Sequence, residues 1–105
     1  MDKNEAIKIA NRYIVSVSSR YRIDSVILFG SFAKGTYHAD SDIDLAIVFE
    51  SVDDIIEMQI ELLRLRTDDD LLIEPHPFQL ADFNLSNPVV SEILKNGIKL
   101  TNPAA

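Results

Sequence analysis

The run 42-DIDLAIVF-49 is the feature that most narrows the folds open to this chain. Apolar residues fill most positions on both alternating sides, which is typical of a strand buried in a sheet. Asp42 and Asp44 stand two residues apart at its start, so strand geometry projects both carboxylates from the same face. Two such carboxylates repel each other unless a cation lies between them, and Mg²⁺ or Mn²⁺ suits oxygen ligands of this kind. The alternative is a solvent-facing polar edge of an antiparallel sheet.

Length and composition predict a single domain, residues 1–105, with a real core, because 47% of the 105 residues are hydrophobic. The net charge of −7 and the scattered bases argue against a long nucleic acid as partner. A single nucleotide remains compatible, since acidic side chains can hold metal ions that bridge its phosphates. No apolar run approaches the ~20 residues that span a membrane, and the start carries no signal-peptide pattern. We therefore expect a cytoplasmic protein that does not enter a membrane.

Hydrophobic periodicity predicts a mixed α/β or α+β layer fold, in which a small sheet is flanked by helices. A helix joins the last two expected strands, which is compatible with a parallel pair. The expected elements are a helix over 3–20, a strand over 25–29, a turn from Gly30 to Gly35, a strand over 42–49, a helix over 52–65 capped by Ser51, a strand over 71–74 stopped by Pro75 and Pro77, and a helix from Pro88 to Asn96 with a left-handed cap at Gly97.

The helix over 52–65 is apolar on more than one side, and two interpretations follow. It lies deep in the domain, which is the interpretation we favour, or it keeps a surface for a partner or for a second copy of the chain.

Gly30 and Ser31 end the first strand just before the expected turn. Gly30 has no Cβ, so the backbone there can approach a ligand closely. Exposed backbone N–H groups and the Ser31 hydroxyl can cradle phosphate oxygens, although simple capping by Ser31 is the commoner explanation of such a pair.

The combination is more specific than its parts. Gly30-Ser31 and Asp42-x-Asp44 are separated by ten residues, and the motif includes Ala33, Gly35, Ser41 and Leu45. This pattern resembles the signature of the DNA polymerase β-like nucleotidyltransferase superfamily. The order of elements is also similar to that family's palm-like core, so the resemblance covers nearly the whole chain.

The resemblance implies a site for phosphoryl transfer with two Mg²⁺ ions, or Mn²⁺, and ATP as substrate. Gly30, Ser31 and Lys34 would then bind the phosphates. Asp42, Asp44 and a third carboxylate would hold the metal ions and be catalytic, and Glu74 in 71-LLIEPHPF-78 matches that third place. The alternative for Glu74 is an exposed edge-strand residue beside prolines.

At this site the sequence departs from the family pattern at two positions. The family more often has Asp at the third carboxylate, and Arg is frequent where this chain has Lys34, which lacks the bidentate fork. His76 follows Glu74 by two residues and could orient an acceptor or a leaving phosphate, although we favour a loop histidine without a catalytic role.

The short, acidic chain resembles the minimal nucleotidyltransferases that act as antitoxins beside small helical HEPN-type proteins. This resemblance implies a protein adenylyltransferase that moves AMP from ATP onto a hydroxyl of such a partner. One alternative is an antitoxin that acts by binding alone and has a vestigial nucleotide site. Another is a small-molecule nucleotidyltransferase of the aminoglycoside-modifying kind. A homo-oligomer is compatible with each.

Overall fold

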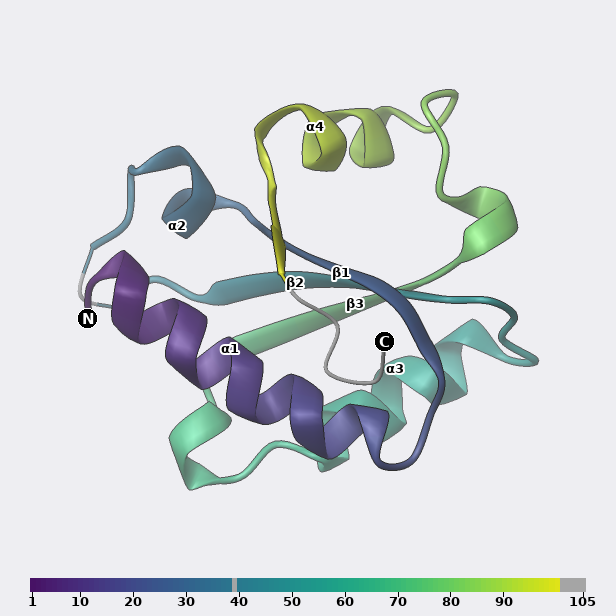
Figure 1. Ribbon diagram of the computed structural model, residues 1–105, viewed down its shortest axis with the longest axis horizontal. Coiled ribbons are helices and arrows are strands. Elements are labelled where there is room, and N and C mark those ends of the chain that lie inside the picture. The colour runs from purple at the N-terminus through teal and green to yellow at the C-terminus, as the bar shows by residue number, and fades with distance from the viewer. Residues whose placement is uncertain (39, 101–105) are drawn as a thin grey trace.

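The structure is a computed structural model that describes residues 1–38 and 40–100. Ala39 and residues 101–105 of the predicted domain lie outside the described residues. Figure 1 shows the arrangement of the helices and strands. The elements are α1 (Lys3–Ser18), β1 (Ile23–Phe29), α2 (Ser31–Lys34), β2 (Ile43–Phe49), α3 (Ile55–Arg64), a short 3₁₀ turn η1 (Asp68–Asp70), β3 (Ile73–Gln79), a second one η2 (Leu80–Asp82), α4 (Pro88–Asn96) and β4 (Ile98–Leu100).

The four strands form one mixed sheet in the order β3-β2-β1-β4. β1 pairs antiparallel with both β2 and β4, whereas β2 and β3 run parallel. α3 provides the crossover that a parallel pair needs. The predicted mixed sheet with flanking helices is confirmed.

Helices cover both faces of this sheet (Figure 1). The larger core lies on the side of α1 and α3, where Tyr13, Phe32 and Leu62 are fully buried against the strands. The Tyr13 hydroxyl donates a 2.6 Å hydrogen bond to the Leu62 carbonyl, which ties α1 to α3. A smaller cluster of Ile27, Ala46 and Ile93 joins α4 to the opposite face. Asp44 lies on the same face as Ala46, because the two are two residues apart on β2.

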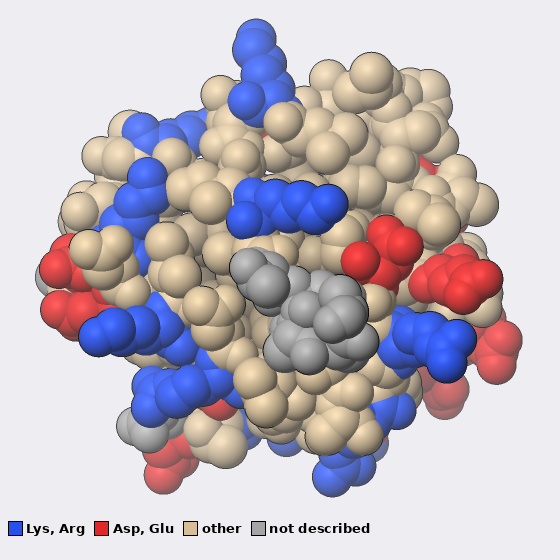
Figure 2. All heavy atoms as spheres, in the orientation of Figure 1, with Lys and Arg blue, Asp and Glu red and all other residues tan. Residues whose placement is uncertain are grey.

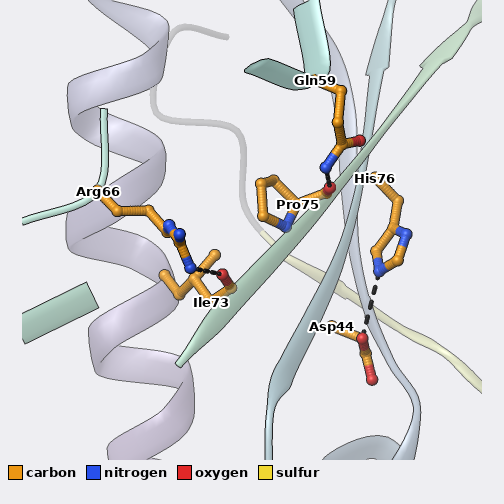
Figure 3. Close-up of polar contacts among 6 residues, drawn as sticks. All are labelled: Asp44, Gln59, Arg66, Ile73, Pro75 and His76. Carbon is orange, nitrogen blue, oxygen red and sulfur yellow. Dashed lines mark hydrogen bonds and ion pairs between the residues drawn. The ribbon is translucent and has the colours of Figure 1, made fainter. Parts of the chain in front are cut away.

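The expectation that β3 stops at Pro75 is wrong, because the strand runs through both prolines to Gln79. β3 is an edge strand, so positions whose backbone faces away from β2 lose no sheet hydrogen bond to a proline. The Pro75 carbonyl accepts a 2.7 Å hydrogen bond from Gln59 Nε2 of α3, and the Ile73 carbonyl accepts one from Arg66 (Figure 3). Side chains thus cover the outer edge of β3.

The cap of α3 is Asp54 rather than Ser51, so the helix begins three residues later than expected. The Asp54 carboxylate accepts hydrogen bonds from the Ile56 and Glu57 amides. Its negative charge also interacts favourably with the positive end of the helix dipole. The favoured interpretation of a deeply buried helix is also wrong. Leu62 is its one fully buried residue, whereas Ile55, Ile56 and Ile60 are exposed.

Gly97 does not form the expected left-handed cap, because its backbone is extended at φ −78° and ψ 163°. A Cβ at this position would collide with the Ile27 side chain and the Ile93 carbonyl. Glycine is therefore required here for close packing between α4 and β1. Among the described residues, no helix is both long and apolar enough to cross a membrane.

Candidate functional site

Asp44 and Glu74 are direct neighbours in the register of the parallel strands β2 and β3. Side chains of registered neighbours project from the same face, so both carboxylates lie on the face that α4 covers in part. Both residues are half-buried. Within the described part of the chain, the Glu74 side chain has no hydrogen-bond or ion-pair partner. A carboxylate without a protein partner can accept hydrogen bonds or coordinate a cation, so Glu74 is available to a cation or to a polar substrate group.

Asp42 lies just before β2, which begins at Ile43. Its side chain is exposed, in contrast to the half-buried Asp44. The loop before it is held by the Ser41 hydroxyl, which accepts a 2.8 Å hydrogen bond from the His38 amide. Asp42 therefore lies at the open, solvent-facing end of the site.

Gly30 packs against Asp44, because β1 and β2 are paired with Phe29 opposite Asp44. Its backbone has φ 75° and ψ −152°, a conformation that is essentially restricted to glycine. A Cβ at Gly30 would collide with the Asp44 carboxylate. The glycine is thus required twice, by its dihedral angles and by the carboxylate beside it.

Ser31 and Lys34 belong to α2, the helical turn that follows Gly30. Gly30 is the N-cap and no side chain caps the turn, so the capping role considered for Ser31 is not observed. Lys34 Nζ lies 2.8 Å from Glu92 Oε1 of α4. The hydrogen bond from Lys34, followed by that from Asn96, holds the pKa of Glu92 below its ordinary value. Lys34 must leave Glu92, at least in part, to bind a phosphate.

His76 lies on β3 and not in a loop, contrary to the interpretation that we favoured. Its Nε2 is 3.2 Å from Asp44 Oδ1, as the dashed line in Figure 3 shows. Its ring also packs on Phe29, with 5.1 Å between ring centroids. His76 therefore holds one oxygen of Asp44 while Gly30 leaves room for the other.

The donor set fits a hard cation such as Mg²⁺, since Asp42, Asp44 and Glu74 offer only carboxylate oxygens. Within residues 1–38 and 40–100, no group of three or more acidic or histidine side chains lies close enough to share one metal ion. Mg²⁺ normally takes one or two carboxylates and completes its shell with water and substrate phosphates. The registered pair of Asp44 and Glu74, with the space that Gly30 leaves beside Asp44, meets that requirement.

Two residues of the site were missed or undervalued from the sequence. The i, i+2 spacing of Glu74 and His76 would have placed His76 beside the carboxylates, had β3 been extended past the prolines. Glu92 had no comparable signal, because only the packing of α4 brings it to Lys34.

The sequence matches, over residues 12–104, the family model described as "Polymerase beta, Nucleotidyltransferase". Two proteins of Methanocaldococcus jannaschii, both named "Putative protein adenylyltransferase", are 39% identical over 66 residues and 35% identical over 57 residues. These matches cover 60% and 52% of this chain. They span 63% and 58% of the length of those two relatives.

Solved structures with the same fold were also found. A "putative nucleotidyltransferase" from Sulfolobus solfataricus superposes with a TM-score of 0.71 at 19% identity, over 92% of this chain and 80% of that one. A chain of the toxin-antitoxin MntA-HpeT gives 0.58 at 22% identity, over 88% and 71% of the two chains. A chain of a toxin-antitoxin crystal structure with AMP-PNP gives 0.54 at 21%, over 96% and 73%. At these identities the likeness is one of fold.

Proposed function

Because this chain belongs to the polymerase beta nucleotidyltransferase family, we propose that it transfers AMP from ATP to a hydroxyl of a partner protein. The observation that carries the proposal is the registered pair of Asp44 and Glu74, with Gly30 packed against the Asp44 carboxylate. Mg²⁺ commonly takes one or two carboxylates together with substrate phosphates, and a backbone without a Cβ lets a phosphate approach closely, so both features suit metal-dependent phosphate chemistry.

Each residue has a distinct role in this proposal. The backbone at Gly30 and the Ser31 hydroxyl bind the β- and γ-phosphates, and Lys34 joins them after it leaves Glu92. Asp42, Asp44 and Glu74 would hold Mg²⁺. Bound Mg²⁺ would supply charge stabilisation for the triphosphate and lower the pKa of the acceptor hydroxyl.

The transfer exchanges one phosphorus–oxygen bond for another. The acceptor oxygen forms a bond to the α-phosphorus, the bond from that phosphorus to the bridging oxygen of the β-phosphate breaks, and pyrophosphate leaves. Glu74 accepts the proton of the hydroxyl, because it is a half-buried carboxylate without a partner in the described part of the chain. His76 keeps Asp44 oriented through its 3.2 Å contact.

The choice of a protein as acceptor is supported by the two relatives named as protein adenylyltransferases. Structural neighbours from toxin-antitoxin complexes, one of them with AMP-PNP, support a role as an antitoxin that uses ATP. We propose a small helical HEPN-type protein as the partner. The exposed apolar residues of α3 give such a partner a surface to contact.

Two forms of labelled ATP test the proposal. The protein is incubated with Mg²⁺, a purified HEPN-type protein as the candidate partner, and ATP labelled at either the α- or the γ-phosphate. We expect label on the partner from α-labelled ATP alone, because AMP carries only the α-phosphate. Asp44→Asn, which keeps the size of the side chain, should abolish the label, and Asp24→Asn, at an exposed position on β1, should not.

Other outcomes would identify a different activity. Label from γ-labelled ATP would mean a kinase, and the proposal would be wrong. Stable complex formation without label would favour an antitoxin that acts by binding alone. Transfer to an aminoglycoside in place of the partner would favour a small-molecule nucleotidyltransferase.

A further inference from the structure

An open apolar groove of about 340 Å³ lies between the start of α3 and the middle of β3. We call it the α3–β3 groove. Its volume is near the lower end of the ~300–1,000 Å³ of ligand pockets, so it suits one large side chain better than a whole nucleotide. It is lined by Ile55, Ile56, Gln59, His76, Pro77 and Phe78.

The groove continues directly into the candidate site, because His76 lines the groove and also contacts Asp44. Figure 3 shows His76 reaching from β3 toward Asp44 on β2, with Gln59 of α3 at the outer edge of β3. In the register of β2 and β3, Glu74 is paired with Asp44 and His76 with Ala46, so both residues of β3 lie between the outer edge of the sheet and β2.

The order of the strands fixes the side from which an acceptor enters. Gly30 and Ser31 follow β1, on one side of Asp44, and Glu74 and His76 are on β3, on the other side. In phosphoryl transfer the attacking and leaving oxygens lie roughly in line. If the leaving pyrophosphate lies over Gly30 and Ser31, the acceptor hydroxyl comes from the β3 side, where the groove is.

The surface next to the groove is acidic. Asp53 and Asp54 directly precede the groove isoleucines Ile55 and Ile56, Glu57 directly follows them, and all three acids are exposed. The same acids line a second, larger hollow on this helix. Figure 2 shows acidic side chains gathered on the side where β2 runs into α3. A chain with a net charge of −7 would attract a positively charged segment here.

We propose that the α3–β3 groove is the acceptor subsite of the transfer reaction. Its occupant is a partner segment that carries the acceptor hydroxyl on a large apolar side chain, flanked by Lys or Arg. The apolar body lies against Ile56 and Phe78, the basic flanks face Asp53 and Glu57, and the hydroxyl points toward Glu74. This assignment rests on the proposed function, because it takes the phosphate side of the site as given.

Two separate NMR titrations of ¹⁵N-labelled wild-type protein test the assignment without any transfer reaction, because neither sample contains both the nucleotide and the acceptor. The first ligand is a synthetic peptide with one tyrosine between lysines, and the second is AMP-PNP with Mg²⁺. We expect the peptide to shift amides of Ile55, Ile56 and Phe78, and AMP-PNP to shift those of Gly30 and Ser31. Added salt should weaken binding of the peptide, because its basic flanks bind through exposed charges that salt screens.

A matched pair of variants then locates the contact. Ile56 and Leu85 are exposed to almost the same extent, at 70% and 71%, so neither Ile56→Ser nor Leu85→Ser should affect folding. Ile56→Ser should lower the affinity of the peptide about tenfold, as for a central contact residue, and leave the affinity of AMP-PNP unchanged. Leu85→Ser should change neither.

Three results would overturn the assignment: a peptide that does not bind at millimolar concentration, peptide shifts outside the groove, or AMP-PNP shifts within it. The last would make the groove a nucleobase site. Peptide binding in the groove with no AMP transfer by the wild-type protein would leave the subsite in place and refute the proposed function instead.

Discussion

Replacing Gly30 with Ala tests whether this glycine exists to let the backbone approach Asp44. A non-glycine residue at φ 75° and ψ −152° costs about 1–3 kcal/mol from the backbone alone. The new Cβ would also collide with the Asp44 carboxylate, so the total loss of folding free energy should exceed the backbone part. Gly35→Ala is the matched control. Gly35 also has a positive φ, of 80°, but a Cβ there meets nothing within 4 Å, so only the roughly 1–2 kcal/mol of left-handed strain applies.

A double-mutant cycle isolates the collision from the backbone strain. Asp44→Ala removes the carboxylate that the Cβ at residue 30 would meet, so Gly30→Ala should cost less in that background than in the wild-type protein. We expect a coupling of about 0.5–3 kcal/mol, as for side chains in direct contact. The combination of Gly35→Ala with Asp44→Ala should be additive, because no contact joins those positions.

The assay is urea unfolding of the six proteins, followed by circular dichroism and extrapolated to water. They are the wild type, Gly30→Ala, Gly35→Ala, Asp44→Ala and the two double mutants. Additivity of Gly30→Ala and Asp44→Ala within about 0.5 kcal/mol would refute the close approach. The Asp44 carboxylate would then have no packed position beside the proposed phosphate cradle.

Three further predictions concern the contacts around the site and the core. Glu92→Gln should lower the KM for ATP, because it weakens the pairing of Lys34 that competes with phosphate, whereas Glu61→Gln on α3 should leave this KM unchanged. Tyr13→Phe should destabilise the fold by about 1–3 kcal/mol in urea unfolding, because the buried Leu62 carbonyl loses its donor. Burial raises the pKa of Tyr13 above its ordinary value of about 10, so its stabilising contribution is complete below that pH and falls as pH rises further. The unfolding midpoint of the wild type should therefore fall more steeply above about pH 10 than that of Tyr13→Phe.

Elements with strong periodicity or a specific motif could be predicted from the sequence. The strand over 42–49 and the helix over 3–20 agree with β2 and α1 to within two residues at each end. The sequence was compatible with a parallel pairing of β2 and β3. The structure has this pairing and adds the register, in which Asp44 lies opposite Glu74.

The errors arose where tertiary position overrides local preference. Pro75 and Pro77 would stop a strand at the centre of a sheet, but β3 is an edge strand, which the sequence does not reveal. Gly97 is typical of a left-handed helix end, yet here it is needed because Ile27 leaves no room for a Cβ. In α3, apolar residues on more than one side of the helix favoured burial, and the side that faces the core is shown by the buried Leu62, whose carbonyl accepts a hydrogen bond from Tyr13.

The residues of the candidate site also divide into those that the sequence could predict and those that depend on tertiary packing. Asp42 and Asp44 were identified from a motif, which is a local property of the chain, and Glu74 from the place at which the resemblance implies a third carboxylate. The contact of His76 with Asp44 and the pairing of Lys34 with Glu92 depend on how separate elements pack, so sequence patterns could not predict them.

The most direct test of the account is the position of the bound metal. Mn²⁺ is paramagnetic and broadens the NMR signals of nearby amides, so it can be titrated into ¹⁵N-labelled protein with AMP-PNP. We predict the strongest broadening at Asp42, Asp44 and Glu74, and its loss in Asp44→Asn. The competing location is the exposed acidic hollow at the start of α3, lined by Asp53, Asp54, Glu57 and Glu61. Broadening centred there, and unchanged in Asp44→Asn, would contradict the assignment of the transfer site.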